Sequence, residues 1–394
     1  MFSDLAVPKA DPILGLTQLF AADSSPEKVD LGIGVYKDEA GEVPVLATVK
    51  AAERWLTETQ MSKRYFSSAG NDAFNSATRS LLFGAQSDAF TRSRTVQAPG
   101  GTGALRLGMD FLRVARPGGR VFIPTPTWTN HGHLLAAAGC EVVNYPYYDV
   151  ATGKLRFDAM MEALQDLAAK DVLLLHGCCH NPSGADLDAD GWRAITDTLG
   201  RSGALPFVDL AYLGFAEGLE EDTYGIRLLA RRLPEVVIAS SYSKNFALYR
   251  DRVGALTIVG ANAADSDRAY EHLMPLARAL WSMPPDHGAA VVAHVLGDAL
   301  LAADWRQELA EMRTRINMIR ALLVKHLGGA ARDYAFLSRQ RGMFALLGLS
   351  PEAVRTLREE HHVHMTGTSR ANVAGLNIAN VERVARAIAS VSDL

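Results

Sequence analysis

The stretch SSYSKNFALYRDRVG, residues 240–254, places one lysine, three serines and two arginines between apolar runs that are typical of buried strands. A lysine at a strand end with few charged neighbours can have a depressed pKa and act as a nucleophile. A lone lysine is more often a solvated loop residue. Lys244, however, is accompanied by Ser241, Ser243 and Arg252, whose donors suit a phosphate group. The stretch therefore predicts a reactive amine beside an anion site.

Three other polar stretches follow apolar runs. GGTG, with Gly101 and Thr102, opens a helical pattern, where backbone N–H groups can hold an anion, although glycines also simply make tight turns. Asp209 ends ALPFVDL, where a buried carboxylate needs a partner; it either caps a helix or faces a cationic ligand group. Asn181, in HNPSG, either belongs to a plain turn or donates its amide into a cleft.

Taken together, these groups describe one cofactor. Pyridoxal phosphate needs a Schiff-base lysine, a carboxylate at its pyridinium nitrogen and an anion site for its phosphate. Lys244, Asp209 and the phosphate donors come from separate predicted strands. The sequence thus predicts a pyridoxal phosphate site.

The elements that must position these residues alternate between apolar, strand-like runs and helical patterns. Such alternation predicts a mostly parallel α/β sheet covered on both faces, with polar groups at the carboxyl ends of the strands. The strand-like runs are Arg94–Ala98, Arg120–Ile123, Cys140–Tyr145, Val172–Gly177, Ala204–Leu210, Glu235–Ser240 and Ala255–Val259.

The two ends of the chain lack the regular alternation of strands and helices that is predicted for the middle. Asp11 followed by Pro12 predicts the start of a short helix, and residues 305–327 have a long helical pattern with Gly328 as the stop. A last helix is expected from Asn380. We expect residues 1–44 and 305–394, the latter including the long connecting helix, to form a smaller domain, and residues 45–304 a large cofactor-binding domain.

Composition narrows the class of protein. The chain has 394 residues, 48% hydrophobic and 21% charged, with a formal net charge of -4. This balance is typical of a globular protein, and no dense basic run suggests nucleic-acid binding. No secretory signal or membrane-length apolar run is present, and three cysteines suit a reducing compartment, so we expect a cytoplasmic protein.

The run His176-Gly-Cys178-Cys179-His180 superficially resembles a metal site. Adjacent cysteines on a strand would point to opposite faces and could not converge on one ion. We therefore expect no metal.

Over nearly its whole length the chain resembles class I, fold-type-I pyridoxal-phosphate aminotransferases of the aspartate and aromatic amino-acid branch. The resemblance implies an α/β fold with a mostly parallel seven-stranded sheet in the large domain and a smaller α/β domain from both termini. It also implies a homodimer with shared active sites. The matching stretches, in order, are LGIGVYKDEAG, GGTGAL, PTWTNH, HGCCHNPSG, DLAYLGF, SSYSKNF, RDRVGA and SRANVAG.

The resemblance implies a role for each matched residue. The catalytic residues would be Lys244, as the Schiff-base and proton-transfer residue, Asp209, which would pair with the pyridine nitrogen with support from His131, and Tyr212. The other cofactor-binding residues would be Tyr212 and Asn181 at the phenolic oxygen, Trp128 beside the ring, and Gly101, Thr102, Ser241, Ser243 and Arg252 at the phosphate, with Tyr65 from the partner subunit.

For the substrate, Arg370 would grip the α-carboxylate as a bidentate fork, with Gly34, Trp128 and Asn181 beside it. Arg278 aligns with the arginine that reaches the distal carboxylate in the other subunit. The implied reaction moves the amino group of an aromatic amino acid or aspartate to 2-oxoglutarate by a ping-pong mechanism.

Near Arg278 the chain departs from the family's usual residues. Trp281 and Met283 offer more apolar surface, which favours aromatic side chains. Other positions match the aspartate-specific pattern, and we expect dual use of aspartate and aromatic donors. Those positions are Val35, Lys37 and Thr102.

The alternatives are a narrow aspartate aminotransferase and, on the same fold, a pyridoxal-phosphate β-lyase or decarboxylase, which would not need both Arg278 and Arg370. A nicotinamide-dependent dehydrogenase would carry a glycine fingerprint that this sequence lacks. A non-catalytic binding module could lose the lysine, which this chain keeps.

Overall fold

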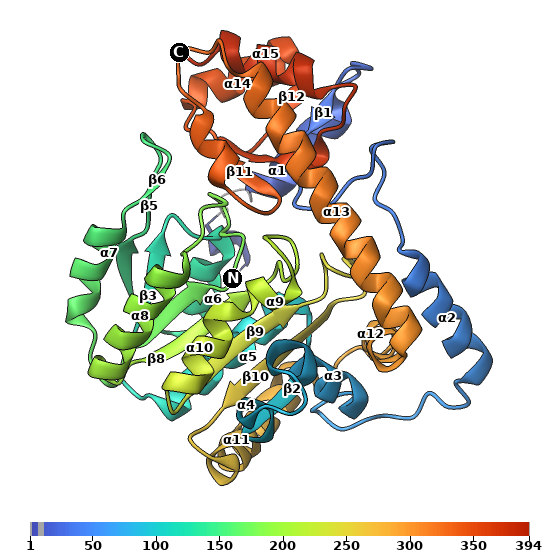
Figure 1. Ribbon diagram of the computed structural model, residues 1–394, viewed down its shortest axis with the longest axis vertical. Helices are drawn as coiled ribbons and strands as arrows, with labels where there is room; N and C mark the ends of the chain where they lie inside the picture. The colour runs from blue at the N-terminus through green and yellow to red at the C-terminus, as the bar shows by residue number, and fades with distance from the viewer. Residues whose placement is uncertain (1, 7–11, 394) are drawn as a thin grey trace.

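A seven-stranded sheet forms the centre of the computed structural model, which describes residues 2–6 and 12–393 (Figure 1). The strand order is β2-β10-β9-β8-β7-β3-β4, and β10 runs antiparallel to both of its neighbours. The predicted mostly parallel α/β sheet is confirmed. The strands are β2 (Ser93–Pro99), β3 (Arg120–Thr125), β4 (Glu141–Pro146), β7 (Val172–His176), β8 (Leu205–Leu210), β9 (Val236–Ser241) and β10 (Val253–Val259).

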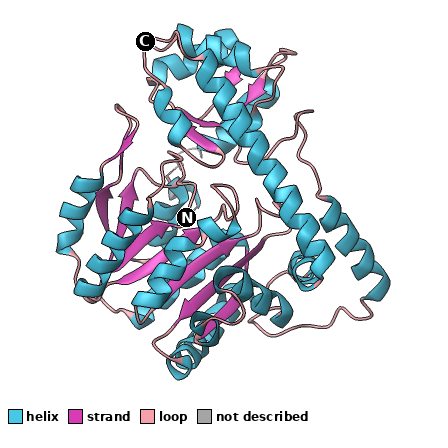
Figure 2. Ribbon diagram, viewed as in Figure 1, coloured by secondary structure: helices cyan, strands magenta, loops and turns pink. Residues whose placement is uncertain are grey.

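Helices cover both faces of this sheet because its strands are apolar on both sides (Figure 2). In β9, Val237 and Ala239 face one hydrophobic cluster, whereas Val236 and Ile238 face the other. Helices α5 (Gly100–Ala115), α6 (Thr129–Ala138) and α11 (Ala263–Trp281) contribute to the first cluster. Helices α3 (Asp72–Phe83), α8 (Ala189–Ser202), α10 (Tyr224–Arg232) and α12 (His287–Gly297) contribute to the second.

A smaller body, at the top of Figure 1, combines segments from both ends of the chain. Strand β1 (Val29–Asp30) pairs in parallel with β12 (Val363–His364), and β11 (Phe344–Leu346) pairs antiparallel with β13 (Arg370–Asn372). These strands share a core with the end of α13 (Ala299–His326) and with α14 (Pro351–His361) and α15 (Val381–Ser390). The division into domains at residues 44/45 and 304/305 stays a prediction.

Helix α13 begins earlier than the sequence pattern indicates. The expected start was Trp305, but the helix begins at Ala299, because Asp298 caps it by accepting hydrogen bonds from the N–H groups of Leu300 and Leu301. The helix ends at His326, just before the expected stop. The last helix, α15, was expected from Asn380 and begins one residue later, at Val381. At the N-terminus, α1 spans Pro12–Ala22, and its expected cap, Asp11, lies outside the described residues.

Helix α2 (Ala47–Thr59) lies against α12 and α13. In the described ranges, no single helix is long and apolar enough to cross a membrane. Helices α12 and α13 pass that test only as a pair bent by 104°, and the apolar residues of α12 belong to the hydrophobic core. The shorter elements are α4 (Asp88–Thr91), α7 (Phe157–Ala163), α9 (Leu219–Asp222), β5 (Tyr148–Asp149), β6 (Lys154–Leu155), and the 3-10 turns Phe2–Asp4, Leu164–Asp166, Ala335–Arg339 and Val373–Gly375.

Candidate active site

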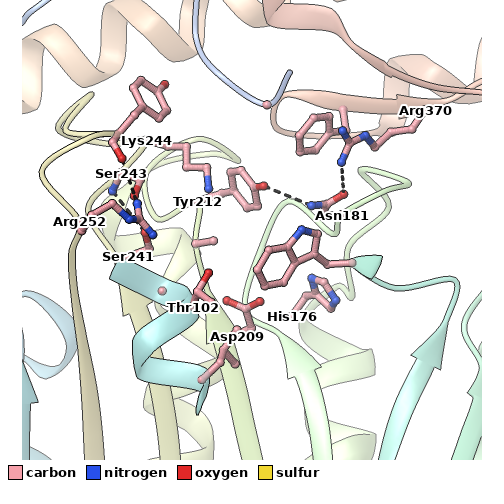
Figure 3. A pocket seen from close by; sticks show the side chains of 17 residues that line it. Thr102, His176, Asn181, Asp209, Tyr212, Ser241, Ser243, Lys244, Arg252 and Arg370 are labelled. Carbon is pink, nitrogen blue, oxygen red and sulfur yellow. Dashed lines mark hydrogen bonds between the residues drawn. The ribbon is translucent and has the colours of Figure 1, made fainter. Parts of the chain in front are cut away.

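A cavity of about 270 Å³ opens where the carboxyl ends of the central strands face the smaller body (Figure 3). It gathers side chains that are far apart in the sequence. The sequence-predicted residues that line it are Gly34, Gly101, Thr102, Trp128, Asn181, Asp209, Tyr212, Ser241, Ser243, Lys244, Arg252 and Arg370.

Lys244 lies in the loop that follows β9, and its amine points into the cavity (Figure 3). Trp305 of α13 fixes this loop. Its indole N–H donates to the carbonyl of Asn245 at 2.8 Å, and the ring of Phe246 stacks on its ring. Burial, together with the charges of Arg252 and Arg370, lowers the pKa of Lys244 to about 8 against the opposing charge of Asp209. The amine is therefore partly neutral near pH 8 and able to act as a nucleophile or base.

Asp209, near the end of β8, lies beneath the cavity and is bonded to a buried imidazole. Its Oδ2 is 3.0 Å from Nε2 of His131, whose Nδ1 is 2.8 Å from the hydroxyl of Thr127. Burial alone would raise the pKa of Asp209, but the hydrogen bond with His131 and nearby positive charges bring this pKa below its ordinary value. The carboxylate therefore stays ionised and can hold a proton on a basic ligand atom.

The opposite wall offers an anion site. Helix α5 starts directly after β2, so the N–H groups near Gly101 and Thr102 lie at a helix N-terminus beside the hydroxyl of Ser241. The guanidinium of Arg252 donates to the hydroxyl of Ser243 at 3.3 Å and to the carbonyl of Tyr249 at 3.0 Å. The structure therefore brings these groups together along one wall of the cavity.

Arg370, in β13, forms the side of the cavity that belongs to the smaller body. It donates to the Asn181 amide oxygen at 3.3 Å and to the carbonyl of Gly32 at 2.7 Å, and its guanidinium lies 4.4 Å from the ring centre of Phe344. It is 8% exposed, its Nε is buried without a partner, and no described carboxylate forms an ion pair with it. A buried guanidinium without a counter-ion is suited to bind a carboxylate.

The phenol of Tyr212 lies between these two sides. It accepts a long hydrogen bond of 3.4 Å from the Asn181 amide, and the amine of Lys244 lies 4.9 Å from its ring centre. Burial raises the pKa of Tyr212, so it remains a neutral phenol able to donate to a ligand oxygen.

Three predicted site residues do not line the cavity of this single chain. His131 lies behind Asp209, as its supporting role requires. Tyr65 is 88% exposed, and Arg278, near the end of α11, is also exposed. Their contribution to the site of a second subunit, which the family resemblance implied, stays a prediction.

The structure adds residues that sequence reasoning missed. His176 ends β7 next to Asp209 of β8, and burial lowers its pKa to about 3, so it is neutral. The position of His176 at a strand end was a usable signal, and Tyr249 lies within the stretch SSYSKNFALYRDRVG. Phe344 carried no such signal. The added lining residues are Leu105, His176, Ala211, Tyr249 and Phe344.

The donor set fits pyridoxal phosphate. The lining residues bear three cationic groups, Lys244, Arg252 and Arg370, against the single carboxylate of Asp209, which favours an anionic ligand. The amine, the ionised carboxylate and the helix N-terminus face one shared volume. These are the three contacts that the cofactor requires.

The adjacent cysteines are not on a strand, contrary to the argument from sequence. Strand β7 ends at His176, and Cys178 and Cys179 are buried in the loop beyond it, the latter with a left-handed φ of 51°. Nδ1 of His180 bonds to the hydroxyl of Ser183. Within residues 2–6 and 12–393, no group of three or more His, Cys, Asp or Glu side chains could hold a metal ion.

Comparison with known proteins gives consistent matches over the full chain. The family model for aminotransferase class I and II matches residues 26–388. The chain is 46% identical to the aspartate aminotransferase of Escherichia coli, covering 99% of this chain and 100% of the relative. It is also 46% identical to the aromatic-amino-acid aminotransferase of Pseudomonas aeruginosa, covering 99% and 98%.

Solved structures agree. The aromatic-amino-acid aminotransferase of Burkholderia pseudomallei, covalently bound to pyridoxal phosphate, superposes with a TM-score of 0.97 at 42% identity, covering 100% of this chain and 99% of that one. The cytoplasmic aspartate aminotransferase of Saccharomyces cerevisiae gives 0.96 at 33% identity, covering 100% and 98%.

Proposed function

Because the chain belongs to the class I and II aminotransferase family, we propose that it moves the amino group of aspartate or an aromatic amino acid to 2-oxoglutarate. The cofactor is pyridoxal phosphate, and the kinetics are ping-pong. The observation that carries this function is the cavity that joins the amine of Lys244, the carboxylate of Asp209 and the guanidinium of Arg370, which has no counter-ion among the described residues. A β-lyase or decarboxylase is not favoured, since the relatives above are named aminotransferases.

The residues divide the work by charge. When bound, pyridoxal phosphate supplies an aldehyde for amino groups and a ring that accepts electrons from the substrate Cα. Arg252, Ser241 and Ser243 would hold its phosphate, and Asp209 would keep a proton on its ring nitrogen. Arg370 would bind the α-carboxylate of the substrate. Lys244, whose pKa is about 8, would remove the proton from the substrate Cα as a general base and then donate a proton back as a general acid.

Spectroscopy of the purified holoenzyme tests this function. Adding glutamate should convert the visible band of the bound cofactor into the shorter-wavelength band of its amine form, with release of 2-oxoglutarate. Adding oxaloacetate or an aromatic oxo acid should restore the first band. A band that does not change with any amino donor would contradict the proposal.

Donor choice depends on the region around Arg278. Trp281 is packed against the apolar cluster that includes α5, and the Met283 sulfur accepts the N–H of Phe66 at 2.9 Å. This apolar surface supports dual use, with Arg278 engaging dicarboxylates and moving aside for aromatic side chains. Ranking kcat/KM for aspartate, tyrosine and phenylalanine tests it, and a donor range confined to aspartate would favour the narrow aspartate aminotransferase.

We infer that the active unit is a homodimer. Segment 61–66, which contacts Met283 through Phe66, carries exposed apolar side chains: Met61 at 92%, Tyr65 at 88% and Phe66 at 47%. Such a patch marks an interface, and a two-fold dimer would bring Tyr65 and Arg278 to the partner's cavity. Light scattering should give twice the 42.5 kDa chain mass, and a monomer with full activity would contradict the dimer.

We also place the protein in the cytoplasm. Its three cysteines are free, two of them buried, which is typical of a reducing compartment. Fractionation of the native host with antibody detection tests this, and recovery in a secreted fraction would contradict it.

The lowered pKa of Lys244 predicts how the cofactor-free protein takes up pyridoxal phosphate. Only the neutral amine attacks the aldehyde, so the rate should rise with pH below the pKa and level off above pH of about 8. Stopped-flow absorbance measures this rate. With Nα-acetyllysine as the reference amine, the rise should continue beyond pH 9, and the same continued rise in the protein would show that its pKa is not depressed.

A further inference from the structure

Tyr249 connects two parts of the active site that the sequence places more than two hundred residues apart. Its hydroxyl accepts the backbone N–H of Tyr36 at 2.8 Å, and its backbone carbonyl accepts from Arg252 at 3.0 Å. The same residue lines the cavity together with Gly34 and Lys244. One tyrosine therefore contacts both the phosphate arginine and the segment that carries Gly34.

That segment, residues 33–37, is otherwise bound to the smaller body. The Asn372 amide donates to the carbonyls of Ile33 and Val35, both at 2.7 Å, and the N–H of Lys37 donates to the carbonyl of Ala374 at 3.3 Å. Gly34 lies against Phe344, which leaves no room for a Cβ atom. The bond from Tyr36 to Tyr249 is thus the hydrogen bond that ties segment 33–37 to the β9–β10 loop, residues 242–252.

The hydrogen bond from the Tyr36 N–H to the Tyr249 hydroxyl is suited to hold the backbone in place rather than to transfer a proton. Tyr36 is 6% exposed, so its N–H would have no ready water partner if the Tyr249 hydroxyl were absent. Burial raises the pKa of Tyr249, so the phenol stays neutral and its oxygen accepts a bond without carrying charge. The amine of Lys244 and the guanidinium of Arg252 are the cationic groups that line the cavity on this side.

We propose that Tyr249 is a positioning residue that sets segment 33–37, and with it the Arg370 side of the substrate site, at the correct distance from the cofactor side. Arg370 donates to the carbonyl of Gly32, immediately before this segment, so displacement of the segment displaces the carboxylate-binding guanidinium. Such a residue affects substrate binding more than the chemical step. The inference rests on the proposed function and adds a residue to which the resemblance assigned no role.

The test compares Tyr249→Phe with a matched control, Tyr145→Phe, in the holoenzyme. Tyr145 is buried, and its hydroxyl, like that of Tyr249, bonds to one backbone group, here the carbonyl of Leu174, but it lies in β4 outside the cavity. Maleate, a dicarboxylate without an amino group, is titrated against the visible absorbance of the bound cofactor. Unfolded protein carries no such band, so the titration reports only folded holoenzyme.

Tyr249→Phe should raise the Kd for maleate and the KM for aspartate about tenfold, as expected when a buried N–H loses its acceptor. Its kcat should fall less than about threefold, and Tyr145→Phe should keep the wild-type Kd. A Kd within twofold of wild type, an equal rise in both variants, or a loss confined to kcat would overturn the inference. If wild-type enzyme fails to convert glutamate, the proposed function itself falls, and this inference with it.

Discussion

Lys244→Ala should lower kcat for aspartate by about 10⁴-fold or more, because the substrate Cα loses the group that removes and returns its proton. The amine is the basic group that projects into the cavity, with a pKa of about 8, whereas a guanidinium does not act as a proton acceptor in proteins. Steady-state and single-turnover rates, followed by the cofactor absorbance, measure the effect.

The variant Lys244→Arg distinguishes the role of Lys244 as a base from the role of its positive charge. An arginine keeps the positive charge beside Asp209 but does not deprotonate in the working pH range, so this variant should be as impaired as the alanine variant. A variant of the surface residue Lys154→Ala is the control and should keep wild-type rates. Substantial activity in Lys244→Arg would mean that charge, not proton transfer, is what Lys244 supplies.

Arg370→Lys should lower kcat/KM for every amino-acid donor by about 10²- to 10³-fold. The planar guanidinium can hold a carboxylate through two parallel hydrogen bonds, and an ammonium cannot, although it keeps the charge. The arginine is held in position by its contacts with Asn181, Gly32 and the ring of Phe344, so it binds the carboxylate better than a lysine at position 370 would. The loss should lie mainly in KM and in the Kd for maleate.

Two controls define this result. Arg92→Lys alters another buried arginine, which bonds to carbonyls of Ala230 and Gly260 away from the cavity, and should change stability but not KM. An amine substrate without a carboxylate should react equally slowly with the wild-type enzyme and with Arg370→Lys. A large loss with that amine as well would show that Arg370 does not act through the carboxylate.

The local parts of this architecture could be predicted well. Each strand of the large sheet shows a run of apolar residues, and parallel strands bring their carboxyl ends to one edge. Asp209, Asn181 and Lys244 could therefore be placed together from the sequence. The start of α13 was predicted wrongly, because the cap by Asp298 begins the helix before its apolar stripe is evident.

The sequence by itself thus determined the fold class, the cofactor and the residues at the strand ends, because strand periodicity and side-chain chemistry are local properties. Only the tertiary structure decided that Phe344 and Tyr249 enclose the site, and that Arg370 reaches Asn181 across 189 positions of the chain. These contacts depend on how the smaller body packs over the sheet. That packing is set by the sum of many buried side chains, and no short stretch of sequence encodes it.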